Sequence, residues 1–155
     1  MEGEHKIMLE QNVRIKLLKE NAKVPTYGTP YAAGADIYAC IDEDVTIKPG
    51  EAKMIPTGFA LEVPVGYAGL IYPRSGLSCK RGLAPANKVG VVDTDYRGEV
   101  MVCLHNHSTI EQTIEVGERI AQLIITPYLK AIFEESDTLE ETGRGDSAFG
   151  STGRK

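Results

Sequence analysis

The chain has 155 residues, of which 42% are hydrophobic and 25% charged, and its formal net charge is −5. This composition fits one globular domain and excludes a globally disordered, collagen-like or disulfide-framework chain. The acidic balance also argues against non-specific nucleic-acid binding, which depends on cations facing phosphates. A polyanionic ligand would therefore be held by a few local cations.

The lack of a recognisable targeting signal and the pattern of cysteines favour an intracellular protein. No apolar run reaches the roughly 18 to 20 residues that a membrane helix needs. The polar segment 1–12 is not expected to act as a secretory signal. Cys40, Cys79 and Cys103 form no CxxC pair, which is typical of reduced thiols in the cytosol.

Short runs of β-forming residues recur along the chain, and turn signals such as Pro49-Gly50 and Gly117 separate them. Short strands with turns every 8 to 12 residues or so are typical of a sandwich or a barrel. We therefore predict an all-β domain with a short helix over 77–81. The predicted strands are 13–18, 36–40, 45–47, 52–55, 59–63, 67–72, 89–92, 99–105, 112–116, 120–126 and 129–133.

Composition divides the chain into three parts. We expect an N-terminal extension over 1–12, a β-domain over 13–135 and a C-terminal arm over 136–155. The arm is rich in glycine, serine and threonine, and Phe149 is its single aromatic residue. From composition alone it is either a frayed terminus or an arm that orders over a ligand, with Phe149 stacking on a planar ring.

The segment Tyr72 to Ser78 carries the first candidate binding residues. A predicted strand ends at a proline, and a guanidinium, a hydroxyl and a glycine follow in a tight loop. Arginine presents a planar fork of donors to phosphate oxygens, and glycine lets the backbone approach an anion. A plain strand-to-helix turn with a surface arginine explains the same residues.

The segment Asn87 to Gly98 carries the candidate catalytic residues. An apolar strand ends in Asp93 and Asp95, next to Tyr96 and a glycine turn. Carboxylates at a strand end suit a general base, although aspartate is also common in hairpin turns. Gln122 interrupts an apolar run and needs a polar partner. His105 and His107 lack a third ligand, so we expect no zinc site there.

Five motifs, taken together, resemble the trimeric dUTP diphosphatase (dUTPase) family and occur in that family's order. The resemblance implies an all-β, jelly-roll-like subunit, a distorted β-barrel of the β-clip type, with a flexible C-terminal arm. It implies a cytoplasmic homotrimer, or one in the host-cell cytosol if a phage or virus encodes it, with active sites shared between subunits. The motifs are AGADIYA (33–39), PRSGLS (73–78), GVVDTDYRGE (90–99), GERIAQL (117–123) and RGDSAFGSTG (144–153).

The resemblance also implies hydrolysis of dUTP to dUMP and pyrophosphate, with Mg²⁺ bound to the triphosphate and no direct metal ligand in the protein. This activity would keep uracil out of DNA and supply dUMP for dTMP synthesis. By the same resemblance, Asp93 is the general base that activates a water for attack on the α-phosphorus. Tyr96 would pack beneath the deoxyribose, and Met101 would flank the base pocket. The hairpin residues that would read the uracil edge are Asn87, Gly90, Val91 and Val92.

The phosphate residues implied by the resemblance come from three motifs. Asp36 would sit behind the phosphates, in reach of the magnesium through water. Phe149 would stack on the uracil as the arm closes. The residues expected to hold or enclose the phosphates are Arg74, Ser75, Gly76, Gln122, Arg144, Gly150 and Ser151.

One position departs from the family pattern, which has a Gly-Gly pair where this chain has Ser147-Ala148. A positive φ at Ala148 would cost roughly 1 kcal/mol. Two other functions fit the same fold, namely a dCTP deaminase or bifunctional relative, and a regulatory protein switched by nucleotide. The intact Asp-x-Asp-Tyr segment and the arm with Phe149 favour dUTP.

Overall fold

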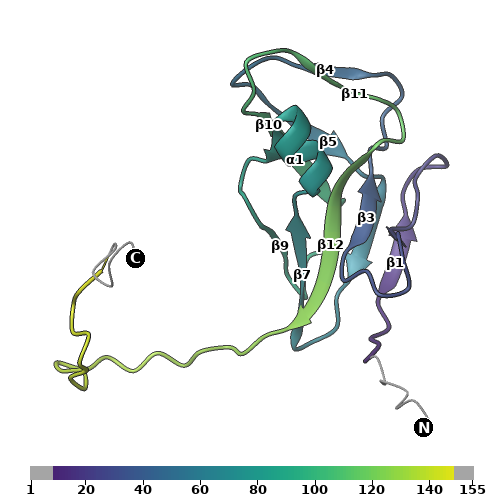
Figure 1. Ribbon diagram of the computed structural model, residues 1–155. Helices are drawn as coiled ribbons and strands as arrows, with labels where there is room; N and C mark the ends of the chain where they lie inside the picture. Colours follow the sequence, from purple (N-terminus) through teal and green to yellow (C-terminus); the bar gives the residue numbers. More distant parts are fainter. Residues whose placement is uncertain (1–8, 149–155) are drawn as a thin grey trace, which may run out of the picture.

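The computed structural model describes residues 9–148 and is almost entirely β-structure, with one short helix (Figure 1). No helix within this range is long and apolar enough to span a membrane. The elements are β1 (Arg14–Leu17), β2 (Thr26–Tyr27), β3 (Ala35–Tyr38), β4 (Val45–Ile47), β5 (Ala52–Pro56), β6 (Phe59–Glu62), β7 (Tyr67–Tyr72), α1 (Ser75–Arg81), β8 (Leu83–Pro85), β9 (Gly90–Val92), β10 (Met101–Asn106), β11 (Gln112–Ile114) and β12 (Arg119–Pro127).

The largest sheet has five strands in the order β2-β3-β12-β7-β9, and every pairing in it is antiparallel. A second sheet has the order β5-β10-β8, and the pairs β1-β6 and β4-β11 complete the fold. The sequence-based prediction of an all-β fold is confirmed. The strands of the described chain pair in separate sheets and do not close into one barrel.

The core lies between these sheets and is aliphatic. Side chains that alternate along the strands supply it, including the fully buried Ile37, Ile55, Phe59 and Leu104. This alternation is what a half-buried strand requires, because successive side chains point to opposite faces. The outer face of each strand is therefore free for polar residues, and the candidate site is built there.

Two short strands were missed, and one predicted strand was wrong. β2 has two residues, and β8 contains Pro85, which a pattern search excludes from a strand. β8 tolerates its proline because it is the edge strand of its sheet. The predicted strand over 129–133 does not form: this segment is extended but unpaired.

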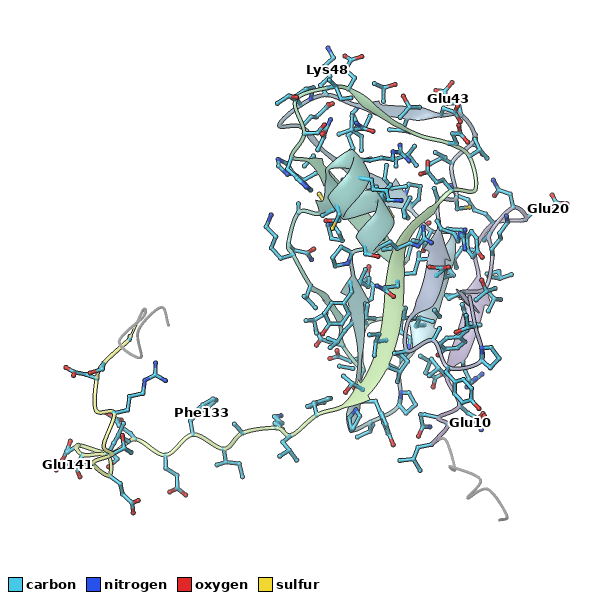
Figure 2. The ribbon with its side chains drawn as sticks, viewed as in Figure 1. Glu10, Glu20, Glu43, Lys48, Phe133 and Glu141 are labelled. Atoms are coloured by element: carbon cyan, nitrogen blue, oxygen red, sulfur yellow. The ribbon has the colours of Figure 1, made fainter. Side chains whose placement is uncertain are left out.

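The chain after β12 leaves the body of the molecule as an extended segment (Figures 1 and 2). Its apolar side chains are almost fully exposed, with Leu129 at 98%, Ile132 at 91% and Phe133 at 95% of their accessible area. Apolar side chains on a segment with no tertiary contacts contribute nothing to the stability of a single subunit. Such exposure marks a surface that contacts another molecule.

Candidate active site

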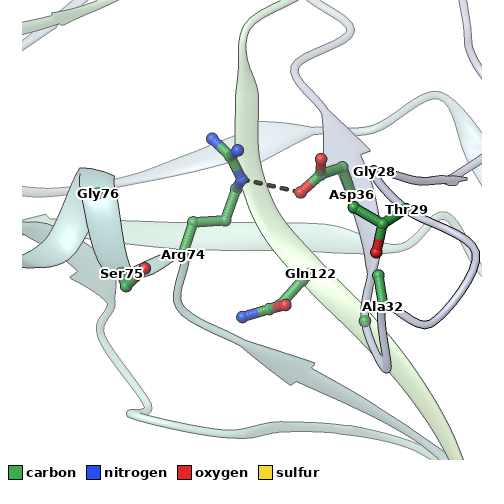
Figure 3. Close-up of a pocket in the computed structure, with 9 residues that line it drawn as sticks. Gly28, Thr29, Ala32, Asp36, Arg74, Ser75, Gly76 and Gln122 are labelled. Atoms are coloured by element: carbon green, nitrogen blue, oxygen red, sulfur yellow. Dashed lines mark hydrogen bonds and ion pairs between the residues drawn. The ribbon is translucent and has the colours of Figure 1, made fainter.

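A polar pocket of about 220 Å³ lies over one face of the five-stranded sheet (Figure 3). One wall is the loop 28–34 before β3, and the other is the start of α1. The pocket gathers residues from three separate motifs, which the sequence places up to 88 positions apart, from Gly34 to Gln122. The predicted site residues that line it are Asp36, Arg74, Ser75, Gly76 and Gln122.

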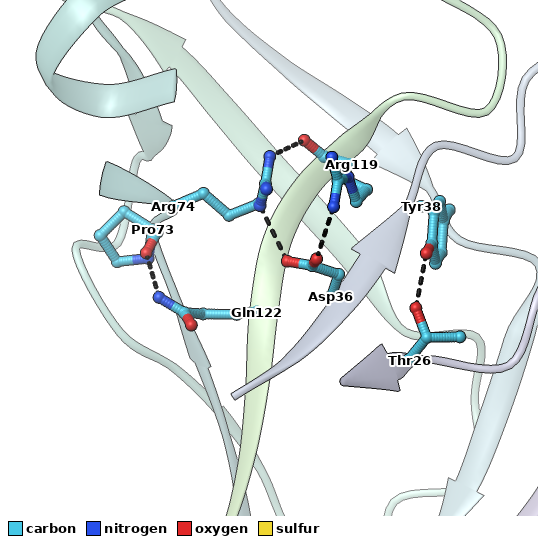
Figure 4. Close-up of polar contacts among 7 residues, drawn as sticks. All are labelled: Thr26, Asp36, Tyr38, Pro73, Arg74, Arg119 and Gln122. Carbon is cyan, nitrogen blue, oxygen red and sulfur yellow. Dashed lines mark hydrogen bonds and ion pairs between the residues drawn. The ribbon is translucent and has the colours of Figure 1, made fainter. Parts of the chain in front are cut away.

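Asp36 organises the cations beside this pocket (Figure 4). Arg74 donates from Nε to one carboxylate oxygen at 2.8 Å, and Arg119 donates from Nη1 to the other oxygen at 3.2 Å. The Asp36 side chain is only 13% exposed, so water screens these ion pairs less than it screens surface pairs. Arg74 also donates to the carbonyl of Arg119 at 3.3 Å.

A bulge in β12 brings Arg119 to this face. Arg119 is paired with Tyr38 and Ala121 with Ile37, so Ile120 is an extra residue between them. In a regular strand, positions 119 and 122 would point to opposite faces, since their spacing is odd. The bulge restores them to one face, as bulges near functional sites commonly do. A strictly alternating strand would place Arg119 on the opposite face from Gln122, so the sequence alone does not predict Arg119 at this site.

Gly34 makes room for the amide of Gln122. A Cβ at position 34 would lie 2.3 Å from Oε1 of Gln122, far inside contact distance. The amide nitrogen of Gln122 donates to the carbonyl of Pro73 at 2.9 Å, which holds the side chain against the start of α1. An amide within an apolar run needs a polar partner, and for Gln122 that partner is the carbonyl of Pro73.

A second, more apolar pocket of about 280 Å³ lies beside the loop that joins β8 to β9. The hairpin predicted here does not form, because β8 pairs with β10 and β9 pairs with β7, in different sheets. Asn87, Gly90 and Met101, three of the predicted base-binding residues, line it together with Ile71 of β7. A Cβ at Gly90 would lie 3.3 Å from both Asn87 Nδ2 and Ile71 Cβ. Glycine at this position therefore lets the start of β9 and the preceding loop pack closely against β7. Met54 and Cys103, cross-strand partners in β5 and β10, were not predicted but also line this pocket.

The loop between β8 and β9 is strained at Lys88. Its φ is 66°, and no other non-glycine residue between Leu9 and Ala148 has a positive φ. The Lys88 N–H donates to the carbonyl of Pro85 at 3.0 Å, which closes the turn. Left-handed geometry is costly for a residue with a Cβ and tends to occur at functional loops. Ala148 does not have a positive φ in the extended arm, and its conformation over a ligand stays a prediction.

The candidate base Asp93 directly follows β9 and is exposed. Its carbonyl accepts from the N–H of Tyr96 at 3.2 Å, so the two residues share one turn. The hydroxyl of Tyr96 donates to the carbonyl of Glu99 at 2.9 Å, and its ring lies against Gly98. A Cβ at Gly98 would come within 2.5 Å of that hydroxyl oxygen. Of the predicted hairpin residues outside the pocket lining, Val91 is 61% exposed and Val92 is buried.

The two pockets use opposite faces of the five-stranded sheet. Asp36, Gln122 and Tyr72 are paired in one row across the sheet. Ile71 and Gly90 are paired in the adjacent row. Because successive rows point to opposite faces, these two residues lie on the opposite face of the sheet from Asp36 and Gln122. The two pockets share no lining residue. Within one chain, the predicted phosphate residues and the predicted base residues are therefore not brought together.

The predicted arm residues are only partly described. Arg144 is exposed on a turn of the extended segment and donates from Nε to the carbonyl of Ser147 at 2.9 Å. Phe149, Gly150 and Ser151 lie outside the described residues. In the described part of the chain, no group of three or more His, Cys, Asp or Glu side chains is arranged to hold a metal ion.

Comparison with solved structures identifies the class of protein. A mutant dUTPase of Staphylococcus bacteriophage 80alpha, solved with dUpNHpp, matches with a TM-score of 0.84 and 30% identity over 93% of this chain and 99% of that chain. A mutant dUTPase of phage phi11 of S. aureus, which revealed the coordination of a structural Mg(II) ion, matches with a TM-score of 0.75 and 27% identity over 84% and 100%. The fold thus defines a β-rich nucleotide hydrolase.

Sequence relatives then identify the family. Deoxyuridine 5′-triphosphate nucleotidohydrolase of Maricaulis maris is 47% identical over 92% of this chain and 97% of its own length. The enzyme of the same name from Syntrophotalea carbinolica is 44% identical over 91% and 96%. The dUTPase family model matches residues 20–153. The chain belongs to the dUTPase family, as its five motifs predicted.

Proposed function

We propose that this protein hydrolyses dUTP to dUMP and pyrophosphate, with Asp93 as the general base. The observation that carries the proposal is the position of Asp93 at the end of β9. The first residue of this strand, Gly90, lines the base-sized pocket. Asp93 is exposed and lies three residues after Gly90 along the chain, so a nucleotide with its base in that pocket would have its sugar and α-phosphate within reach of this carboxylate.

The chemical step transfers the nucleotidyl group of dUTP to water. Asp93 accepts one proton from a water molecule, whose oxygen attacks the α-phosphorus as the bond from that phosphorus to the bridging oxygen breaks. The bridging oxygen leaves as part of pyrophosphate, and the product is dUMP. Asp93 then returns its proton to solvent, so no oxidant or covalent intermediate is needed.

Base and sugar selectivity would come from the loop before β9, from β9 itself and from the turn that follows it. Backbone groups around Gly90, Val91 and Val92 would pair with the uracil edge, while Asn87 and Met101 bound the pocket. A site built to pair with one edge rejects a base with a different donor order, because buried groups are left unpaired. The ring of Tyr96, held by its hydrogen bond to Glu99, would exclude a 2′-hydroxyl.

Phosphate binding would use the other pocket. Arg74, Ser75, Gly76 and Gln122 offer a guanidinium, a hydroxyl, a backbone N–H and an amide, which are the donors that phosphate oxygens accept. Asp36 holds the Arg74 guanidinium from behind. Arg144 would bind the terminal phosphate, and the arm would follow with Phe149 on the uracil ring and with Gly150 and Ser151.

A homotrimer with shared active sites reconciles the two pockets. Because they lie on opposite faces of one sheet, the phosphate pocket of one subunit would complete the base pocket of another. The exposed apolar residues Leu129, Ile132 and Phe133 support assembly, since they would be covered by a neighbouring subunit.

The chemistry of the site fits a magnesium ion bound mainly by substrate. Asp36 presents a hard oxygen donor beside the phosphate pocket, but each of its oxygens already accepts a hydrogen bond from an arginine. Asp36 therefore suits a contact through water better than direct coordination. When bound, Mg²⁺ would neutralise negative charge on the triphosphate oxygens.

The cellular role follows from this reaction, which removes a precursor of uracil in DNA and supplies dUMP for dTMP synthesis. A cytosolic location is consistent with Cys40, Cys79 and Cys103, all of which are free thiols in the structure.

Measuring pyrophosphate release from dUTP, dTTP, dCTP and UTP, with and without Mg²⁺, tests the proposal. We expect rapid release from dUTP alone, and only with the ion present. Ammonia release from dCTP would instead identify a deaminase. Binding of dUTP without turnover would identify a nucleotide-switched regulator.

A further inference from the structure

The helix α1 is attached to the start of β12 at both of its ends. Arg74, which precedes the helix, donates to the carbonyl of Arg119 at 3.3 Å. Arg81, its last residue, forms an ion pair with Glu118, the residue before β12. Between these ends, Leu77 is the one buried side chain of the helix. The C-cap Gly82 holds the same end as Arg81, because its carbonyl accepts from the N–H of His107 at 2.8 Å.

Arg81 connects three segments through its guanidinium. Nε donates to Oε1 of Gln112 at 3.2 Å, one terminal nitrogen donates to the carboxylate of Glu118, and the other donates to the carbonyl of Thr113. Glu118 is fixed in turn, because its other oxygen accepts from the N–H of Glu115 at 2.9 Å. The side chains of Arg81 and Glu118 are 34% and 20% exposed, so the pair is partly shielded from water.

The first residues of α1, Ser75 and Gly76, line the phosphate pocket, whereas Arg81 does not. Opposite them is Gln122, on the strand that begins one residue after Glu118. The orientation of α1 relative to β12 therefore sets the width of the pocket. Loss of the Arg81 contacts would leave this end held by Gly82 and the buried Leu83 alone, and so would let Ser75 and Gly76 shift relative to Gln122.

We propose that Arg81 is a positioning residue of the phosphate site, which acts by clamping the end of α1 to Glu118 and β11. This inference rests on the proposed function, because it assumes that Ser75, Gly76 and Gln122 bind the triphosphate. Arg81 touches no substrate. Its planar guanidinium donates hydrogen bonds to three acceptors on two segments at once. A lysine ammonium on its flexible side chain cannot match this fixed geometry.

Arg81→Gln is the informative change, and Lys80→Gln is its matched control. Lys80 lies in the same helical turn, is exposed and forms no ion pair with any described residue. Both changes remove one positive charge near the helix C-terminus, so they share any loss of interaction with the helix dipole. Only Arg81→Gln breaks the clamp. Glu118→Gln weakens it from the other side, and Arg81→Lys should restore part of it.

Dissociation constants for dUpNHpp and for 2′-deoxyuridine, which lacks phosphate, separate positioning from general destabilisation. We expect Arg81→Gln to weaken dUpNHpp binding about tenfold, since small displacements of binding groups have large effects. Deoxyuridine affinity should stay within about twofold of the parent value. The ratio of the two constants does not depend on the fraction of folded protein, so a purely structural role would leave it unchanged.

Equal dUpNHpp affinities for Arg81→Gln and Lys80→Gln would overturn the inference, as would an equal loss of affinity for both ligands. If Arg81→Gln does not fold, Glu118→Gln and Arg81→Lys should change the ratio in the same direction by smaller factors, and an unchanged ratio in both would overturn it. Failure of the parent protein to bind dUpNHpp or to release pyrophosphate from dUTP would instead refute the proposed function.

Discussion

Replacing Gly34 with alanine is expected to impair the phosphate site while leaving the fold almost as stable as before. The new Cβ would lie 2.3 Å from Oε1 of Gln122, so the amide must move. Its hydrogen bond to Pro73 would be lost, which costs about 0.5–1.5 kcal/mol. Lower entropy of the unfolded chain offsets about 0.4–1 kcal/mol of this, because Gly34 does not have a positive φ.

The functional effect should be larger than the effect on stability. A hydrogen bond from an amide to a charged phosphate contributes about 1.5–3 kcal/mol, which corresponds to about 10- to 100-fold in kcat/KM. Steady-state kinetics with dUTP and urea unfolding measure the two quantities separately. Gly28→Ala is the matched control in the same loop, since a Cβ there meets no atom within 4 Å, and its effect should be much smaller.

A double-mutant cycle decides whether Gly34 acts through Gln122. If it does, Gly34→Ala should have little further effect in a Gln122→Ala background, because the amide is already gone. Losses that simply add in the double variant would refute the reasoning. So would a Gly34→Ala protein that is strongly destabilised but retains normal kcat/KM per folded molecule.

Three further predictions concern the other half of the site. Asp93→Asn should lower kcat by at least 100-fold while dUpNHpp binding in calorimetry stays near the parent value, and a near-normal kcat would exclude Asp93 as the base. Asp93→Asn and Arg74→Ala subunits, inactive alone, should regain activity when they are unfolded and refolded together, whereas sites within single chains would give none. Gly98→Ala should displace the Tyr96 ring and raise UTP turnover relative to dUTP, and an unchanged ratio in a pyrophosphate assay would contradict the role given to that ring.

Most of the fold could be predicted because alternation along each strand reflects burial directly. The exceptions have identifiable physical causes. β2 is too short to show any period, and Pro85 is acceptable in β8 only because that strand lies at an edge. The segment 129–133 has strand-forming residues but pairs with no strand in the described chain. Its sequence therefore suits a contact that one subunit does not provide.

The composition of the site could be predicted better than its geometry. The motifs identified Asp36, Arg74 and Gln122, and the structure brings all three into one pocket. Arg119 was missed, because only the bulge at Ile120 turns it to the same face. The sequence also does not predict that the proposed phosphate and base residues lie on opposite faces of the sheet, because this depends on the register of strands that are distant in sequence. The binding and catalytic roles given to all of these residues stay predictions.

The division of the site between the two faces of the sheet has a consequence for how the enzyme responds to dilution. If neither face can hydrolyse a nucleotide alone, a dissociated single chain is inactive. Specific activity should then fall as the protein concentration drops below the dissociation constant of the oligomer. Total activity in the cell would then rise more than proportionally with the concentration of the chain. One defective subunit would also inactivate the sites that it shares with its neighbours.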